Sequence, residues 1–215
     1  IKKCLNNSEL FVRSNPIYQN SKEEINTIVE NGADVIMLPY FKTCQEVQTF
    51  VDYVGGRCKT CLLLETPEAV EIIDDILDID GIDEIHIGLN DLHLGYKMKF
   101  MFELLADGTV EYLCNKFKHK NITYGFGGIA ALGQGTLPAE NIIKEHYRLG
   151  SSMVILSRSF CNTSQITDLN EIDVIFKEGV KAIRDFEKEV NDHLAYFEDN
   201  RQLVKQIVKQ IVDGK

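Results

Sequence analysis

Short apolar runs alternate with longer amphipathic stretches along most of the chain. The runs that we expect to form strands are residues 9–13, 34–38, 58–65, 82–88, 121–126 and 152–156. The stretches between them have the period of helices, the longest running from residue 88 to about residue 117. Strands that are almost wholly apolar and separated by helices predict a parallel sheet covered on both faces. The pattern therefore predicts an α/β fold, and it leaves open both a doubly wound sheet and a (β/α) barrel.

Local signals place several helix starts. Ser21 is followed three residues later by Glu24, which is the spacing of a capping box. Pro67 stands at the favoured first-turn position of a helix that we expect over residues 68–77. A further helix is expected to run through residues 46–51, and another to begin near Pro138.

The C-terminal segment has a helical pattern without strands. Apolar residues recur there every three or four positions, at Phe176, Val180, Ile183, Phe186, Val190, Leu194 and Phe197. Asp199-Asn200 is expected to break this helix, and a second stripe follows at Val204, Ile207, Val208 and Ile211. The stripe is expected to pack on the domain's own core or on a neighbouring subunit. We therefore expect residues 1–165 to form the sheet and residues 166–215 to form a helical extension of the same domain.

Composition excludes some classes of function. Of 215 residues, 44% are hydrophobic and 26% are charged, as in a soluble globular domain. No apolar run is long enough for a membrane span, and a net charge of −10 argues against nucleic acid as a partner. Six cysteines are scattered, and only Cys58 and Cys61 have metal or redox spacing, without a second pair nearby. We interpret them as reduced structural thiols, which predicts a cytoplasmic protein.

Three charged residues stand where apolar strands end. Arg13 ends the first, Glu65 ends the third, and Asp91 closely follows the fourth. Chemistry in parallel α/β folds is placed at the carboxyl ends of strands. Two carboxylates without Cys or His beside them suit a hard cation such as Mg²⁺ or Mn²⁺, and an Arg fork beside it suits a carboxylate or enolate oxygen. The alternative is a salt-bridged triad without catalytic function.

Four segments containing these residues carry a family resemblance: residues 10–16, 32–39, 65–69 and 87–92, in that order. Together they resemble the HpcH/HpaI aldolase and citrate-lyase β-chain family. The resemblance implies a TIM-type (β/α)8 barrel of the phosphoenolpyruvate/pyruvate superfamily. In this family an Arg follows the third strand, a metal-binding Glu ends the fifth, and a metal-binding Asp follows the sixth.

The resemblance also implies a function. It predicts a divalent-metal-dependent carbon–carbon lyase or aldolase that acts on a 2-oxo acid or acyl-CoA substrate through a metal-stabilised enolate. Glu65 and Asp91 would bind Mg²⁺, or Mn²⁺, and Arg13 would be the catalytic and substrate-binding cation. Backbone amides from Gly88 to Asn90 would bind the substrate carboxylate. The family further implies a homo-oligomer.

The chain departs from the family pattern in three ways. Arg13 already lies on the family's third strand, so we expect about six βα units, family strands 3 to 8, and the C-terminal three-quarters of a barrel. The start at Ile1 agrees with a fragment of a longer chain. The family takes its general base from the first two strands, so none is assigned. Tyr40 stands after Pro39 where many relatives have Lys.

Two alternatives remain at this point. The same motifs resemble phosphoenolpyruvate-utilising phosphotransfer barrels, but these have a Cys-Gly pair where Cys161 is followed by Asn162. A non-catalytic accessory barrel that keeps the metal site is the other. The secondary site candidates are His86, His93, Arg158 and the glycine run 125–128, which is expected as a strand-to-helix turn or a phosphate cradle.

Overall fold

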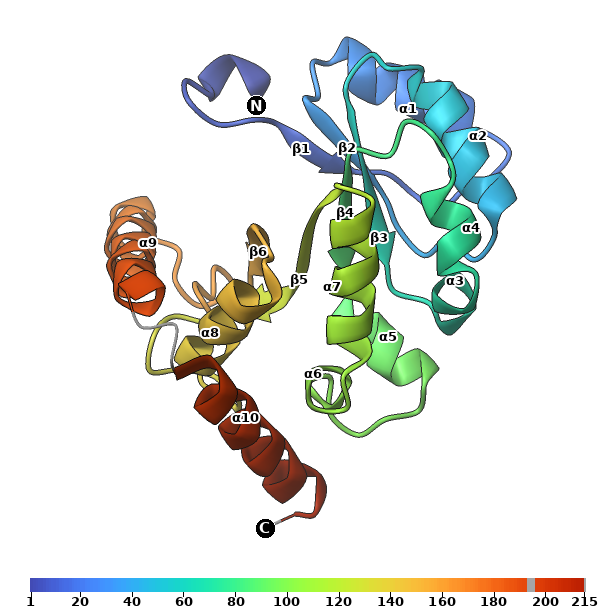
Figure 1. Ribbon diagram of the computed structural model, residues 1–215. Coiled ribbons are helices and arrows are strands. Elements are labelled where there is room, and N and C mark those ends of the chain that lie inside the picture. The colour runs from blue at the N-terminus through green and yellow to red at the C-terminus, as the bar shows by residue number, and fades with distance from the viewer. Residues whose placement is uncertain (193–195, 215) are drawn as a thin grey trace. The chain divides into compact units, whose positions relative to one another are not determined.

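The computed structural model describes residues 1–192 and 196–214 (Figure 1). Within this part of the chain, six strands lie in one sheet in chain order. They are β1 (Phe11–Arg13), β2 (Val35–Leu38), β3 (Lys59–Leu64), β4 (Glu84–Ile87), β5 (Thr123–Ile129) and β6 (Met153–Leu156). A parallel sheet in sequential order is the topology of a (β/α) barrel and not of a doubly wound sheet, whose order reverses at a switch point. The predicted α/β fold with six βα units is confirmed.

Helices alternate with these strands and then continue alone. They are α1 (Ser21–Glu30), α2 (Cys44–Val54), α3 (Pro67–Glu71), α4 (Ile73–Leu77), α5 (Leu89–Gly95), α6 (Glu103–Ala106), α7 (Thr109–His119), α8 (Ala139–Leu149), α9 (Leu169–Asp192) and α10 (Tyr196–Val212). None of the described helices is long and apolar enough to cross a bilayer.

The contacts divide the chain into two compact units. The first comprises Ile1–Met98 and Asn115–Tyr124, and the second comprises Lys99–Cys114 and Gly125–Lys215. The boundary that we expect at residue 165 is a different one, because it separates the sheet from a helical extension within the same domain. That boundary stays a prediction.

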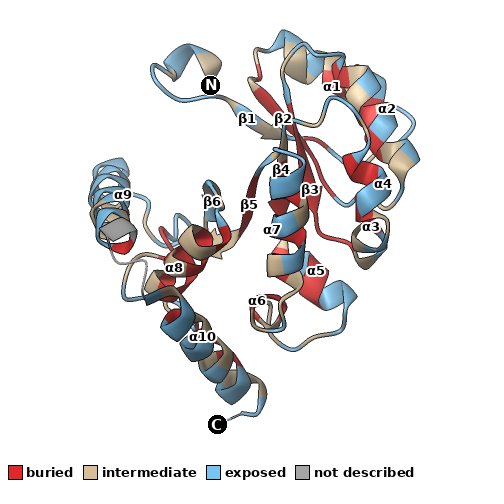
Figure 2. Cartoon of the chain, viewed as in Figure 1, coloured by how far each residue is buried: buried red, intermediate tan, exposed pale blue. Residues whose placement is uncertain are grey.

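The strands of the first unit bury both of their faces. Ile36, Leu38, Leu62 and Leu64 are fully buried, and Figures 1 and 2 show α2 and α4 along one side of this sheet. The alternate residues Val35, Met37, Cys61 and Leu63 form a buried cluster of their own. Since side chains alternate along a strand, these two sets lie on opposite faces. The second set shares its face with the site described below.

One predicted helix start differs from the structure. The residue before α1 is Asn20, and the Ser21 hydroxyl accepts a hydrogen bond from the Tyr18 amide at 2.8 Å. The Glu24 carboxylate accepts hydrogen bonds from the backbone amide and the side-chain amide of Asn15. The predicted capping box at Ser21 is therefore wrong, because both of its side chains bind the preceding loop. A capping box is instead formed before α2, by Thr43 and Glu46.

The helix predicted over residues 68–77 does begin with Pro67 at its first turn. It is interrupted at Ile72, whose φ of −108° and ψ of 22° separate α3 from α4. The long helical region expected to reach residue 117 is likewise three helices, α5, α6 and α7.

The helix break predicted at Asp199-Asn200 is also wrong. Both residues lie inside α10, where Asp199 is in the acidic first turn. Asn200 is buried, and its amide donates to Glu145 at 2.8 Å and to the Asn141 carbonyl at 3.1 Å, which fixes α10 on α8. Of the predicted stripe, Ile183 and Val190 are buried, whereas Leu194 lies outside the described residues.

Candidate functional site

The three charged residues predicted from the sequence come from neighbouring strands of the first unit. Arg13 ends β1, Glu65 directly follows β3, and Asp91 lies in the first turn of α5 after β4. Arg13 pairs in register with Met37, and Leu63 pairs with His86. Two residues further along, the same register places Glu65 beside Gly88. The side chains of Arg13 and Glu65 therefore share the face of the buried cluster that contains Met37 and Leu63.

Glu65 is the buried member of the group. Its residue is 6% exposed, and one carboxylate oxygen, Oε1, accepts a hydrogen bond from the Tyr40 amide at 3.0 Å. The pKa of Glu65 is raised to about 7, first by burial and then by the charge of Asp91 and a hydrogen bond with it, against the lowering effects of the Tyr40 amide and Arg13. Asp91 thus contacts Glu65 directly, and Arg13 lies within the range of its charge. The structure therefore brings Glu65 and Asp91 together, with Arg13 near enough for its charge to act on Glu65.

A glycine allows this contact. A Cβ at Gly88 would lie 2.8 Å from both the Cβ and Oε2 of Glu65. The Gly88 amide donates to the Leu64 carbonyl at 2.9 Å, so it continues the sheet ladder. The part played by Gly88 is therefore to leave room for Glu65, and of the two residues predicted to bind the substrate carboxylate, Asn90 is the exposed one.

A second glycine brings α5 close to the loop after β3. A Cβ at Gly95 would lie 2.6 Å from Cδ of Pro67. Because the pyrrolidine ring is rigid, α5 can pack this closely only without a side chain at its last position. The packing places Asp91, one turn earlier on the same helix, beside Glu65.

The sequence reasoning missed Thr66. Its hydroxyl donates to the Phe41 carbonyl at 2.6 Å and accepts from the Ala69 amide at 3.3 Å. It therefore caps α3 and ties the loop after β3 to the loop after β2. This bond holds Glu65 next to the Tyr40 amide, and a Thr directly before a helix-opening Pro is the signal that could have revealed it.

A cavity of about 470 Å³ opens at this end of the strands. Its lining comprises Tyr40, Lys42, Glu65, Thr66, Pro67, Glu68, Asp91, Leu94 and Gly95. Two of the three predicted residues therefore face a space of the size that small-molecule ligands occupy. Arg13 is exposed at the end of β1, outside this lining.

The carboxylate pair fits a divalent cation. Two carboxylates in contact, one of them buried, repel one another, and an oxygen-preferring cation removes that repulsion. Among the described residues, no group of three or more His, Cys, Asp and Glu side chains could hold a metal ion. Glu65 and Asp91 would thus supply two ligands and leave positions for water and substrate oxygens.

The two secondary candidate histidines are buried near the site, and neither lines the cavity. His86 is buried within β4, and His93 is buried in α5 with Nδ1 3.2 Å from the Leu89 carbonyl, so His93 is not in a mouth loop as expected. Cys61 is buried and Cys58 half-buried, both free, and burial raises the pKa of each thiol. Among the described residues these cysteines form no metal cluster.

The glycine run 125–128 was predicted to follow a strand, and this placement is wrong. The run lies inside β5, which continues to Ile129. The pairing with β6 shifts register between Gly125 and Gly128, and a Cβ at Gly125 would lie 2.2 Å from the Met153 carbonyl oxygen. The glycines therefore allow β5 and β6 to pair closely across a β-bulge, where a side chain would not fit. Arg158 follows β6 in the second unit and is exposed.

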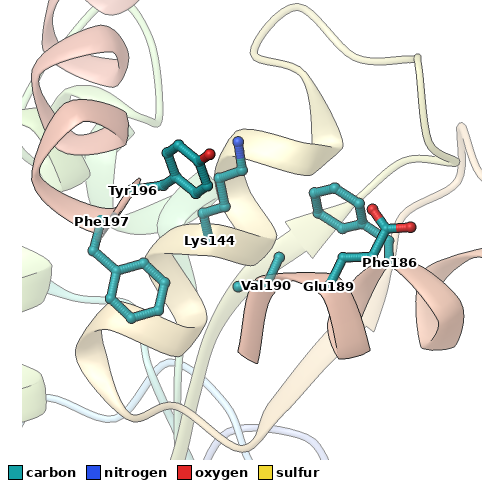
Figure 3. A pocket seen from close by; sticks show the side chains of 6 residues that line it. All are labelled: Lys144, Phe186, Glu189, Val190, Tyr196 and Phe197. Carbon is teal, nitrogen blue, oxygen red and sulfur yellow. The ribbon is translucent and has the colours of Figure 1, made fainter. Parts of the chain in front are cut away.

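The second unit contains a smaller cavity of about 170 Å³ (Figure 3). Side chains from α8, α9 and α10 surround it, among them Lys144, Phe186 and Tyr196. None of the residues predicted to form the site lines it. We therefore place the candidate site at the ends of β1, β3 and β4.

Comparison with known proteins agrees with this fold. Residues 3–103 match the family model described as HpcH/HpaI aldolase/citrate lyase. This segment includes β1 to β4 and all three charged residues, and the family typically depends on a metal. Among curated proteins, none matches the chain. The part of the chain that carries the site thus matches the HpcH/HpaI aldolase/citrate lyase family, as the motifs predicted.

Two solved structures share the fold. One is an HpcH/HpaI aldolase from Desulfitobacterium hafniense DCB-2, with a TM-score of 0.57 and 17% identity, covering 82% of this chain and 72% of that one. The other is a citrate lyase from Burkholderia xenovorans LB400, with a TM-score of 0.57 and 11% identity, covering 70% of this chain. This chain spans 54% of the length of the citrate lyase. At these identities the likeness concerns the fold.

Proposed function

We propose that the chain carries the site of a divalent-metal-dependent carbon–carbon lyase or aldolase that acts on a 2-oxo acid or an acyl-CoA. One observation carries the proposal: Glu65 and Asp91, from successive βα units, meet in a cavity within the segment that matches the family. Further support comes from the metal dependence of the family.

Each residue has a distinct role in this proposal. Glu65 and Asp91 hold Mg²⁺ or Mn²⁺, and the Tyr40 amide orients Glu65 through Oε1. The cation, when bound, supplies positive charge near the substrate oxygens. Arg13 donates from its guanidinium to the oxygen on which negative charge develops when the carbon–carbon bond breaks or forms. Asn90 is proposed to bind the substrate carboxylate.

Proton exchange at the methyl group of pyruvate tests the proposal. In D₂O with Mg²⁺, the protein is expected to exchange methyl protons for deuterium, which is followed by NMR. Glu65→Gln and Asp91→Asn should abolish exchange. Glu84→Gln is the matched control, because Glu84 is a half-buried carboxylate at the opposite end of β4.

The outcomes separate the functions. Loss of exchange in both site variants but not in the control supports the lyase. Binding of metal and pyruvate without exchange by the unmodified chain would instead indicate a non-catalytic accessory barrel. Exchange that persists in Glu65→Gln contradicts the assigned site.

A further inference from the structure

The cavity of the second unit is lined largely by apolar side chains of the C-terminal helices. Phe186 and Val190 come from α9 and Phe197 comes from α10, and Figure 3 shows the two phenyl rings on either side of Val190. All three belong to the apolar stripe that the sequence shows in this segment. Val190 is buried, but both phenylalanines are only half-buried. The stripe therefore leaves aromatic surface uncovered at the cavity.

The helices around this cavity are held by contacts of their own. Asn200 of α10 donates to Glu145 at 2.8 Å and to the Asn141 carbonyl at 3.1 Å, both on α8. Helix α9 also contacts α8, and its Ile183 and Val190 are buried. The walls of the cavity are therefore fixed by contacts that involve no ligand, as is typical of small-molecule sites.

Lys144 of α8 adds a positive charge to the lining. Its side chain is half-buried, and among the described side chains no carboxylate pairs with it, although the exposed Glu189 also lines the cavity. Arg148, one turn further along α8, pairs with Glu145 instead. Figure 3 shows the Lys144 ammonium group on the side of Tyr196, away from the Glu189 carboxylate. A half-buried cation without a carboxylate partner favours an anion in the space beside it.

We propose that this cavity binds a small aromatic carboxylate. Its volume of about 170 Å³ suits one six-membered ring, because an apolar cavity of about 150 Å³ takes benzene. The ring of the ligand packs against Phe186, Val190 and Phe197, where aromatic contacts add to the burial of apolar area. The carboxylate pairs with the Lys144 ammonium group. None of these residues belongs to the candidate metal site, so binding here is independent of the proposed function.

Benzoate and benzamide test the proposal, because they have nearly the same shape and differ in charge. In calorimetric titrations of the metal-free protein with EDTA present, benzoate is expected to bind about tenfold more tightly, as for one charge-assisted pair. Lys144→Met should reduce the ratio of the two dissociation constants to about one, and Lys144→Arg should restore it.

The position of the ring is tested separately. Phe186→Ala should weaken both ligands by about tenfold and keep their ratio, because it removes apolar contacts that the two ligands share. Nuclear Overhauser contacts should join the ring protons of benzoate to the methyl groups of Val190, which lie between the two phenyl rings.

Lys188 provides the matched control. It lies on α9 directly before Glu189, pairs with Asp185 at 2.9 Å and does not line the cavity. Lys188→Met makes the same change of charge as Lys144→Met and should keep the tenfold ratio.

Three results would overturn the proposal. The first is that benzoate binds the unmodified protein no more tightly than benzamide, or that neither binds. The second is that Lys144→Met keeps the ratio, or that Lys188→Met loses it equally, since net charge and not the cavity would then explain the preference. The third is binding that requires Mn²⁺, which would place the ligand at Glu65 and Asp91.

Discussion

Glu65 is placed where ionisation costs free energy. The residue is 6% exposed and contacts Asp91, and its pKa is raised from 4.5 to about 7. A buried carboxylate of this kind destabilises the folded chain unless it is protonated or paired with a cation. The folded chain is therefore electrostatically destabilised when the site holds no metal and Glu65 is ionised. Such a cost at one residue is typical of functional positions.

The raised pKa predicts how metal-free stability depends on pH. Between pH 4.5 and pH 7 the folded chain binds more protons at Glu65 than the unfolded chain does. The contribution of Glu65 to stability is therefore fully present below pH 4.5 and is lost as the pH rises through 7. At pH 8 the loss amounts to about 3 kcal/mol at most.

Urea unfolding of the metal-free protein at pH 5 and pH 8 measures this effect. Compared with the unmodified chain, Glu65→Gln should be clearly more stable at pH 8 and gain much less at pH 5. Equal gains at both pH values would show that Glu65 does not titrate in this range.

At the scale of elements, α5 packs closely against Pro67 because its last residue, Gly95, has no side chain. Gly95→Ala would place a Cβ 2.6 Å from the Pro67 ring. Overpacking of this kind costs about 1–3 kcal/mol and displaces the helix that carries Asp91. We expect affinity for Mn²⁺ to fall about tenfold, because the two carboxylates then move apart.

Gly179→Ala serves as the control for that variant. A Cβ there would lie 2.6 Å from Cζ of Phe160, in the second unit. It should lower the thermal midpoint while affinity for Mn²⁺ stays unchanged. Equal affinities for Gly95→Ala and the unmodified protein would contradict the role given to α5.

Elements whose signal is local and apolar could be predicted from the sequence. The six strands follow from their apolar runs, and the start of α3 follows from Pro67. The errors arose where a polar side chain has more than one possible partner. The pattern predicts a helix cap at Ser21 and a helix break at Asn200, but each side chain binds a partner that the pattern does not indicate, the Tyr18 amide and Glu145.

The placement of the candidate residues could be predicted in part. Arg13, Glu65 and Asp91 follow apolar strands, and parallel strands bring their carboxyl ends to one edge. Tyr40 and Thr66 could not be assigned a role in the site, because their contacts with Glu65 and Phe41 depend on how two loops meet. Neither contact leaves a periodic pattern in the sequence.

On the scale of the molecule, the site lies in the first unit, which also contains the family match except for its last residues, 99–103. Residues 3–103 contain the carboxylate pair, Arg13 and the cavity. The second unit has its own partly buried ion pairs, in which Arg148 and Arg201 both pair with Glu111. Whether the Phe176–Phe197 stripe forms an oligomer contact stays a prediction, with Phe176 and Val180 still more than a third exposed.

The central claim is that Glu65 and Asp91 bind one divalent cation together. A Mn²⁺ titration followed by electron paramagnetic resonance tests it on the unmodified chain, Glu65→Gln, Asp91→Asn and the double variant, with Glu84→Gln as control. Each single variant should lose at least about tenfold in affinity, and the double variant little more, because both ligands serve one ion. No binding by the unmodified chain, or undiminished binding by Glu65→Gln and Asp91→Asn, would contradict the account.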